Sequence, residues 1–291
     1  MRFGRGSLHA KCTEYHPIKQ PIEIKRTGSF LDVNASGHVI KVASTKRFQE
    51  KWRPLIEETR DFYVRECGDN LQSVYVRGSV AKGMAEDETA DLDTFCVVHE
   101  KMGLDERARS VFIEDARKKY PFCSGVELAS VSTHSLKGPD PWGGRNMWLG
   151  IIKTHAACIW GQDLSPTISP FSLSDMITCS RQLRTELEEN LPKYLEEDGD
   201  DPAELRWTCL WVMRKILRTG YELVMFDENR WTNDLYLCWE SFAKGYPDRA
   251  VLMRETLELA LNPVGDTKII SGHIEQWRPW IHEEIAAKLG V

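Results

Sequence analysis

The chain has 291 residues, of which 42% are hydrophobic and 28% are charged, and its formal net charge is −6. This composition is typical of a globular protein with enough chain for two domains, each with its own core. The acidic balance argues against broad binding to a phosphate backbone, so we do not expect a long nucleic acid as substrate.

The sequence shows no sign of a membrane segment or a disulfide framework. No run is long and apolar enough to cross a bilayer, and the basic residues 1–10 lack the apolar core of a secretory signal. The eight cysteines are scattered, and none belongs to a Cys-x-x-Cys pair. We therefore expect a cytoplasmic protein with reduced thiols and no membrane partner.

The pattern along the chain predicts an α+β protein in three parts. Residues 1–44 form an N-terminal extension, in which turn residues around Asn34 and Gly37 predict a small β-hairpin. Residues 45–168 read as a sheet domain, and residues 169–291 read as helices only. The change falls where Pro166 and Pro170 interrupt both periodicities.

The sheet domain is expected to open with an amphipathic helix over residues 45–66. Two runs rich in β-formers follow, over residues 72–77 and 91–98, with a loop over residues 80–90 between them. The remaining expected elements are a helix over residues 104–119, a strand over residues 126–131 and a last short strand over residues 156–160.

The helical domain is expected to contain helices over residues 174–191, 202–225, 233–244, 249–261 and 273–289. Pro192 is expected to end the first of these. The start of the second is well marked, because Asp201 is a good N-cap residue and Pro202 suits the first turn.

Two carboxylates, Asp91 and Asp93, follow the Gly78-Ser79 turn by a short loop. Alternate residues of a strand share a face, so Asp91 and Asp93 are expected to project together. Paired carboxylates repel each other unless a cation lies between them, and hard oxygen ligands suit Mg²⁺. Gly78 lets the backbone approach a phosphate closely, and Ser79 can donate its N–H and its hydroxyl. The alternative is an ordinary strand-loop-strand connection with two solvated aspartates.

The string from Val76 through Gly78-Ser79 to Asp91-Leu92-Asp93 resembles the motif of the nucleotidyltransferase superfamily related to DNA polymerase β. The family pattern is a hydrophobic residue, Gly-Ser, a loop, and then Asp-hydrophobic-Asp. The resemblance implies a polymerase-β-like sheet domain followed by an all-α domain. It also implies Mg²⁺-dependent transfer of a nucleoside monophosphate, from ATP or another NTP, to a hydroxyl group.

Within the superfamily, the chain is most similar to aminoglycoside nucleotidyltransferases of the streptomycin/spectinomycin adenylyltransferase type. The further points of likeness are Glu127 in a strand, the segment from Ile152 to Gly161, and Arg218-Thr219-Gly220 followed by Asn233. The resemblance implies that Asp91 and Asp93 hold the metal and that Glu127 is the catalytic base.

Glu127 is the best candidate for a third acid, because it is a charged residue within an otherwise apolar strand. It would either join the metal site or accept the proton of the acceptor hydroxyl. The alternative places it on the solvent face of its strand, and the loop acids Glu86, Asp87 and Glu88 would then be the other candidates.

The phosphates also need cations. Lys82 lies in the loop after Gly78-Ser79, and the second half of the 202–225 helix contains Arg214, Lys215 and Arg218. We expect Lys82, Lys215 and Arg218 to contribute to nucleotide binding. The alternative for the helix is that its basic residues only match the negative end of the helix dipole.

The sequence leaves the acceptor open. Ala90 stands where the family usually has Ser, and Asn233 stands at the position of a family lysine. The partners expected are an NTP and a small-molecule acceptor, such as an aminoglycoside-like amino-sugar, which we expect to bind between the two halves. The alternatives are an enzyme that transfers AMP to a protein and a catalytically silent nucleotide-binding relative. Nothing in the sequence indicates an oligomeric state.

Overall fold

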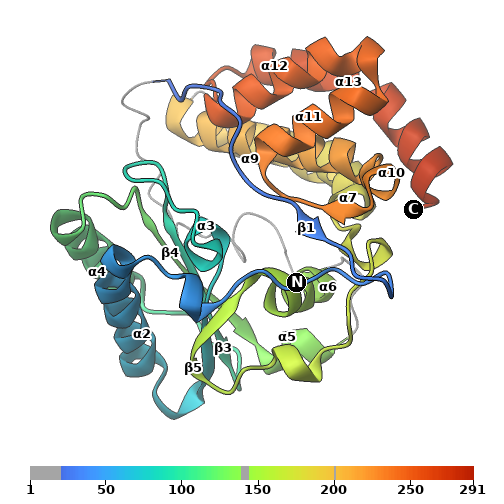
Figure 1. Cartoon of the computed structure of the whole chain (residues 1–291). Helices are drawn as coiled ribbons and strands as arrows, with labels where there is room; N and C mark the ends of the chain where they lie inside the picture. The colour runs from blue at the N-terminus through green and yellow to red at the C-terminus, as the bar shows by residue number, and fades with distance from the viewer. Residues whose placement is uncertain (1–20, 139–143, 200) are drawn as a thin grey trace. The chain divides into compact units, whose positions relative to one another are not determined.

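The computed structural model describes residues 21–138, 144–199 and 201–291. These residues divide into two compact units (Figure 1). Ile40–Phe171 form what we call the sheet unit, and residues 21–39 together with Ser172–Val291 form the helical unit. The predicted α+β fold, with a sheet followed by helices, is confirmed. Within the described ranges, none of the helices combines the length and the apolar character that crossing a bilayer requires.

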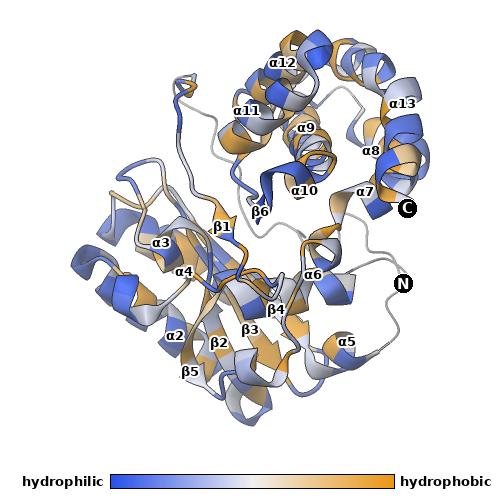
Figure 2. Cartoon of the chain, turned by 45° about the vertical axis from the view of Figure 1, so that its right-hand side comes forward, coloured by the Kyte–Doolittle hydropathy of each residue, from blue (hydrophilic) through white to orange (hydrophobic). Residues whose placement is uncertain are grey.

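The sheet unit contains a four-stranded mixed sheet of order β4-β3-β2-β5. Strand β2 (Leu71–Val76) runs antiparallel to β3 (Leu92–Val98) and to β5 (Ala157–Gly161), whereas β4 (Val126–Ser132) runs parallel to β3. The parallel connection passes through α4 (Glu106–Lys119). Hydrophobic residues dominate β2 and β3 in Figure 2, as expected for strands that are covered on both faces.

Each face of the sheet has its own core. On one face, Val76, Cys96 and Leu128 pack in a cluster with side chains of α2 (Arg53–Cys67) and α4. The alternating residues point to the other face, where Tyr75, Phe95 and Val131 pack with Trp148 of α6 (Gly144–Gly150). The Tyr75 and Phe95 rings stack there with centroids 5.0 Å apart. This alternation decides on which face the charged residues at the strand ends emerge.

The helix predicted over residues 45–66 begins later than expected. The short 3₁₀ turns η1 (Thr45–Arg47) and η2 (Glu50–Trp52) precede it, and α2 starts at Arg53. Phe48 and Gln49 adopt extended backbone conformations, which interrupts the helix. Pro54 then occupies the first turn of α2, where its missing N–H costs nothing.

Two details near the predicted motif also differ. Part of the expected loop forms a short helix, α3 (Gly78–Lys82), which ends at Gly83 in the left-handed conformation. Asp91 lies one residue before β3, so the two aspartates do not both belong to the strand. The glycines and prolines of residues 137–145 also predict a loop, and this segment lies in part at residues 139–143, outside the described residues.

The helical unit is organised around α9 (Pro202–Glu222). Asp201 caps this helix as predicted, because its carboxylate accepts a hydrogen bond from the Ala203 N–H at 2.8 Å. Side chains of α9 share one core with those of the surrounding helices. These helices are α7 (Cys179–Thr185), α8 (Leu191–Asp198), α11 (Leu235–Gly245), α12 (Ala250–Leu261) and α13 (Thr267–Leu289).

The prediction that Pro192 ends a helix is wrong. A π-helical turn, η7 (Glu186–Asn190), links α7 to α8, and Pro192 lies in the first turn of α8. A proline in a first turn removes no regular hydrogen bond, so the helical path continues. Helix α13 also begins before residue 273, because the Asp266 carboxylate caps it by accepting from the Lys268 and Ile269 N–H groups.

Helix α9 holds α7 through a buried carboxylate. Glu222 accepts hydrogen bonds from the N–H groups of Thr178, Cys179 and Ser180 and from the Ser180 hydroxyl. These N–H groups belong to the start of α7 and would otherwise lack partners. Burial raises the pKa of Glu222, and the hydrogen bonds oppose that shift.

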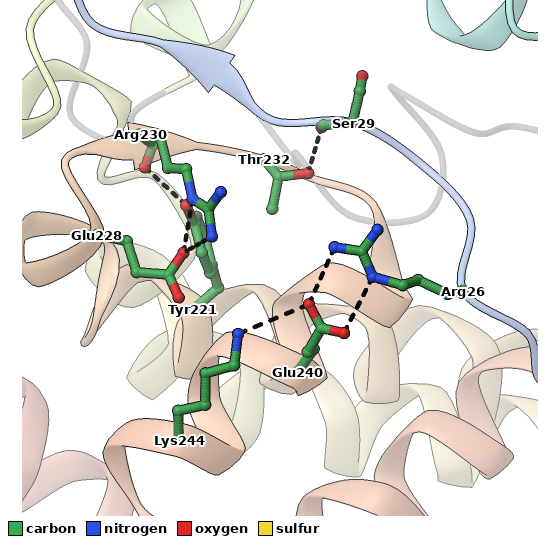
Figure 3. Close-up of polar contacts among 8 residues, drawn as sticks. All are labelled: Arg26, Ser29, Tyr221, Glu228, Arg230, Thr232, Glu240 and Lys244. Atoms are coloured by element: carbon green, nitrogen blue, oxygen red, sulfur yellow. Dashed lines mark hydrogen bonds and ion pairs between the residues drawn. The ribbon is translucent and has the colours of Figure 1, made fainter.

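Residues 21–39 form an integral part of the helical unit (Figure 3). The Arg26 guanidinium pairs with both carboxylate oxygens of Glu240, at 3.1 and 3.3 Å. The Thr232 hydroxyl donates to the Ser29 carbonyl oxygen at 2.9 Å. Strand β1 (Leu31–Asp32) pairs with β6 (Arg230–Trp231). The turn at Asn34–Gly37 that follows is closed by one bridge, between Val33 and Val39.

We predict that Gly28→Ala destabilises the helical unit. Gly28 has a φ of +97°, and an added Cβ would lie 2.4 Å from the Asp234 Cβ. Asp234 also accepts the Ser29 N–H at 2.7 Å. We expect a loss of about 2–4 kcal/mol in the free energy of unfolding, because the steric clash adds to the backbone strain. Urea unfolding followed by circular dichroism measures it.

The matched control is Gly37→Ala. Gly37 has a φ of +78°, and no atom lies within 4 Å of an added Cβ. The control should lose only about 1–2 kcal/mol, the cost of the left-handed backbone conformation. Equal losses in the two variants would contradict the tight packing of residues 21–39 on α11.

Candidate active site

The strand register places two acids beside each other. Asp93 on β3 lies opposite Glu127 on the parallel strand β4. Because side chains alternate along a strand, both project from the face that carries Phe95 and Ala129. Both residues lie near the start of their strands, so the acids meet at one edge of the sheet. Glu127 is buried at 8% exposure, so its predicted alternative, a place on the solvent face, is wrong.

Arg77 completes the cluster from the other side. It follows the last residue of β2, and its N–H donates to the Asp93 carbonyl oxygen at 2.9 Å. Its guanidinium lies 3.4 Å from the Asp93 carboxylate and forms an ion pair with the Glu127 carboxylate. The three side chains are only 22%, 19% and 10% exposed, in the order Arg77, Asp93, Glu127, so solvent screens their charges weakly.

The pKa of Glu127 is raised to about 8. Burial is the main cause, because it disfavours the charged form. The Arg77 charge opposes the shift, whereas Asp93 and Asp91 add to it. Burial also works against the charge of Arg77, but the three carboxylates outweigh it and raise the Arg77 pKa. The Arg77 charge therefore offsets only part of the effect that burial and the two aspartates have on Glu127.

Buried hydrogen bonds fix the backbone beneath the acids. The Thr94 hydroxyl donates to the Glu127 carbonyl oxygen at 2.6 Å. The Tyr63 hydroxyl lies 3.1 Å from the Thr94 hydroxyl and 3.2 Å from the Ala129 carbonyl oxygen. Tyr63 and Thr94 are fully buried. These contacts join α2, β3 and β4, so the separation of Asp93 and Glu127 is set by a rigid part of the fold.

Position 78 requires a glycine. Its φ is +72°, and an added Cβ would lie 2.3 Å from the Asp93 Oδ2. The structure thus brings Gly78 into direct contact with one of the predicted acids, and Ser79 follows it in α3. Asp91 is exposed just before β3 and still acts electrostatically on Glu127. All five residues of the predicted motif and third acid therefore belong to the sheet unit, where Gly78, Asp93 and Glu127 are direct neighbours.

Of the predicted phosphate-binding cations, one belongs to the sheet unit and two belong to the helical unit. Lys82 ends α3 and is buried at 7% exposure. Lys215 belongs to the helical unit, where its ammonium group donates to Gln182 and Glu186, each at 2.8 Å. Arg218 is also in that unit, and its Nε lies 3.4 Å from the Asn233 carbonyl oxygen. Nucleotide binding by these three residues stays a prediction.

The residues fit a hard cation in chemistry, although they do not form a ready-made site. In the described part of the chain, no three His, Cys, Asp or Glu side chains are grouped so that they could hold a metal. The carboxylate oxygens of Asp91, Asp93 and Glu127 are nevertheless ligands that Mg²⁺ prefers. Asp93 and Asp91 add to the rise in the Glu127 pKa, as neighbouring negative charges do. One oxygen of each carboxyl group, Asp93 Oδ1 and Glu127 Oε2, now lies against the Arg77 guanidinium.

Arg77 is the residue that the sequence interpretation missed. The signal was present, because Arg77 lies two positions after Tyr75 and therefore continues the same face of β2. Arg77 follows a buried strand directly, and two acids lie at the start of the next strand. This arrangement indicates an ion pair across the two strands.

Comparisons with known proteins find a similarity among solved structures. No family model matches the sequence, and no curated protein does. Among solved structures, the chain is similar to a spectinomycin adenyltransferase from Enterococcus faecialis, solved with ATP and spectinomycin. The similarity covers 82% of this chain and 98% of that one, with 13% identity and a TM-score of 0.47. The neighbour is an adenyltransferase, the class of enzyme that the sequence resembles. The identity is too low to assign its substrates to this chain.

We predict that Glu127 makes the stability of the metal-free protein depend on pH. A carboxyl with a raised pKa stabilises the fold below its ordinary value of 4.5 and loses this contribution as the pH rises through about 8. In a chelating buffer, the free energy of unfolding should therefore fall more steeply with pH for the wild type than for Glu127→Gln. Urea unfolding at several pH values measures the slopes. Parallel profiles would contradict the raised pKa.

We predict that Gly78→Ala displaces the Asp93 carboxylate. The control is Gly83→Ala, which has a similar φ of +73° and a Cβ clash at 2.6 Å, but with the Arg47 carbonyl oxygen rather than with an acid. Both variants should lose stability, because both add strain and a clash. Only Gly78→Ala should also weaken binding of Mn²⁺ with a triphosphate, measured by electron paramagnetic resonance. Equal Mn²⁺ binding in the two variants would refute the role of the Gly78–Asp93 contact.

Proposed function

We propose that the protein is a nucleotidyltransferase that transfers a nucleoside monophosphate, in the first instance AMP from ATP, to a hydroxyl group of a small-molecule acceptor. One observation carries the proposal. The parallel register of β3 and β4 sets Asp93 opposite Glu127, directly beside the glycine that opens α3. This arrangement supplies paired oxygen ligands and a close approach for a phosphate at one edge of a sheet.

The acids have distinct roles in this proposal. Asp91 and Asp93 hold Mg²⁺, with Glu127 as a third ligand or as the base. When bound, Mg²⁺ neutralises phosphate oxygens and stabilises the charge that develops during transfer. A pKa raised to about 8 makes the deprotonated Glu127 carboxylate a stronger base than an ordinary carboxylate, which suits it to accept the proton of the attacking hydroxyl. Its burial within a fixed strand keeps the carboxylate in one position, as a catalytic base requires.

Residues at the start of α3 would serve the phosphates. Gly78 has no side chain to obstruct the approach, and Ser79 offers a hydroxyl beside it. Lys82, Lys215 and Arg218 are the candidates for neutralising the leaving pyrophosphate. For Lys82 and Lys215 this requires a change of contacts, since Lys82 is buried and Lys215 is bound to Glu186.

The acceptor is proposed by chemistry alone. With a net charge of −6, the protein suits a cationic acceptor, such as a hydroxylated amine or amino-sugar, better than a nucleic acid. A protein side chain is the alternative acceptor. The solved neighbour was crystallised with ATP and spectinomycin. Spectinomycin should therefore be one of the acceptors tested.

We predict that Asp91→Asn abolishes transfer without affecting the fold. Asp91 is exposed and precedes β3, so the substitution should change the free energy of unfolding by less than about 0.5 kcal/mol. The rate of transfer should fall by about 10²-fold or more, because one of the proposed Mg²⁺ ligands is lost. Pyrophosphate release is measured with each NTP, Mg²⁺ and a panel of hydroxylated amines, with a protein mixture as a further acceptor.

The matched control is Asp87→Asn. Asp87 is also exposed, in the loop after α3, and its carboxylate pairs with Lys51 rather than with the site. This variant should turn over like the wild type. Normal turnover by Asp91→Asn, or pyrophosphate release from no NTP by the wild type, would refute the proposed function.

A further inference from the structure

Arg77 contacts the same carboxylates that the proposed function assigns to metal and base. Its guanidinium lies 3.4 Å from the Asp93 Oδ1 and pairs with the Glu127 Oε2. Its backbone is tied to the same residue, since the Arg77 N–H donates to the Asp93 carbonyl oxygen at 2.9 Å. The arginine therefore cannot leave the site as a whole, although its long side chain can turn.

A divalent cation and this guanidinium would compete for the same two carboxyl groups. Mg²⁺ requires close, nearly octahedral contacts with its oxygen ligands. A guanidinium that holds Asp93 and Glu127 blocks part of such a shell, and two cations on the same carboxylates repel each other. Because these side chains are mostly buried, solvent screens that repulsion weakly.

A triphosphate changes the balance, because it offers the displaced guanidinium a new anionic partner. Arginine binds phosphate oxygens through the same planar fork that binds carboxylates. If the metal bound alone, the Arg77 guanidinium would lose its two carboxyl partners. If a triphosphate bound with the metal, its oxygens would replace those partners. Metal and triphosphate should therefore bind more tightly together than the metal binds alone.

We propose that Arg77 is an internal cation that occupies the Asp93 and Glu127 carboxyl groups in the metal-free protein and yields them to a divalent cation only when a nucleoside triphosphate binds with it. This inference rests on the proposed function and specifies how the metal and the nucleotide bind. Metal and nucleotide bind as a cooperative pair, and metal alone binds weakly. Arg77 is thus a positioning residue for the acids rather than a group that reacts.

The test compares Mn²⁺ binding with and without a non-hydrolysable ATP analogue, by electron paramagnetic resonance and by the shift in melting temperature. In the wild type, the analogue should strengthen Mn²⁺ binding by about tenfold or more, a typical coupling between sites. In Arg77→Met, Mn²⁺ alone should bind about tenfold more tightly than in the wild type, and the coupling should shrink. The metal-free variant should melt at a lower temperature and recover with Mn²⁺, because its paired acids lack a cation.

Two further variants keep the test decisive. Arg109→Met removes another buried arginine of the sheet unit, one that pairs with Glu106 instead of the acids, and should lose stability without gaining any response to Mn²⁺. Arg77→Lys keeps a charge but lacks the fork, so it should fold and show an intermediate coupling. It serves as the reporter if Arg77→Met does not fold.

The outcomes separate this inference from the proposed function. Tight Mn²⁺ binding by the wild type without nucleotide, unchanged in the Arg77 variants, would overturn the exchange and leave the transferase intact. A wild type that binds neither Mn²⁺ nor the analogue, alone or together, would overturn both. Stronger Mn²⁺ binding in Arg77→Met or Arg77→Lys with reduced coupling supports the exchange.

Discussion

The ion cluster of Arg77, Asp93 and Glu127 is the constraint on which the rest of the sheet unit depends. Charges that are mostly withdrawn from water are stable only when paired, and removing one partner of such a set is strongly destabilising. The pairing here is not local, because it joins the ends of three neighbouring strands. The order β4-β3-β2 must therefore form before the charges are satisfied. A different strand order would leave at least one of them buried and alone.

The same constraint explains how the elements around the cluster are built. Helix α4 makes β3 and β4 parallel, so both strands start at the same edge and their acids meet there. The Tyr63 and Thr94 hydroxyl groups then fix the β4 backbone from the opposite face. Since the two faces have separate cores, the polar contacts on one side do not disturb the acids on the other. The position of each carboxylate is thus determined by packing rather than by a flexible loop.

Much of this could be predicted from sequence, and the exceptions share a physical cause. Alternation and turn chemistry locate the strands and the capped start of α9, because these signals are local. The role of Arg77 depends on which strands are neighbours, and local patterns do not contain that information. The packing of residues 21–39 is equally non-local, since Arg26 pairs with Glu240 and β1 with β6. Pro192 misled because its effect depends on the π-helical turn before it.

The reach of Arg77 across the sheet follows from strand geometry. Neighbouring strands lie about 4.8 Å apart, so a cation that serves acids on both β3 and β4 must reach across that spacing. The Arg77 Nη2 contacts both carboxyl groups, and the long side chain of arginine brings it there from the end of β2. Gly78, the next residue, leaves no room for a side chain beside Asp93, so the cation must come from the position before it. Position 78 must stay free of a side chain, and the arginine that contacts the acids lies at the neighbouring position, 77.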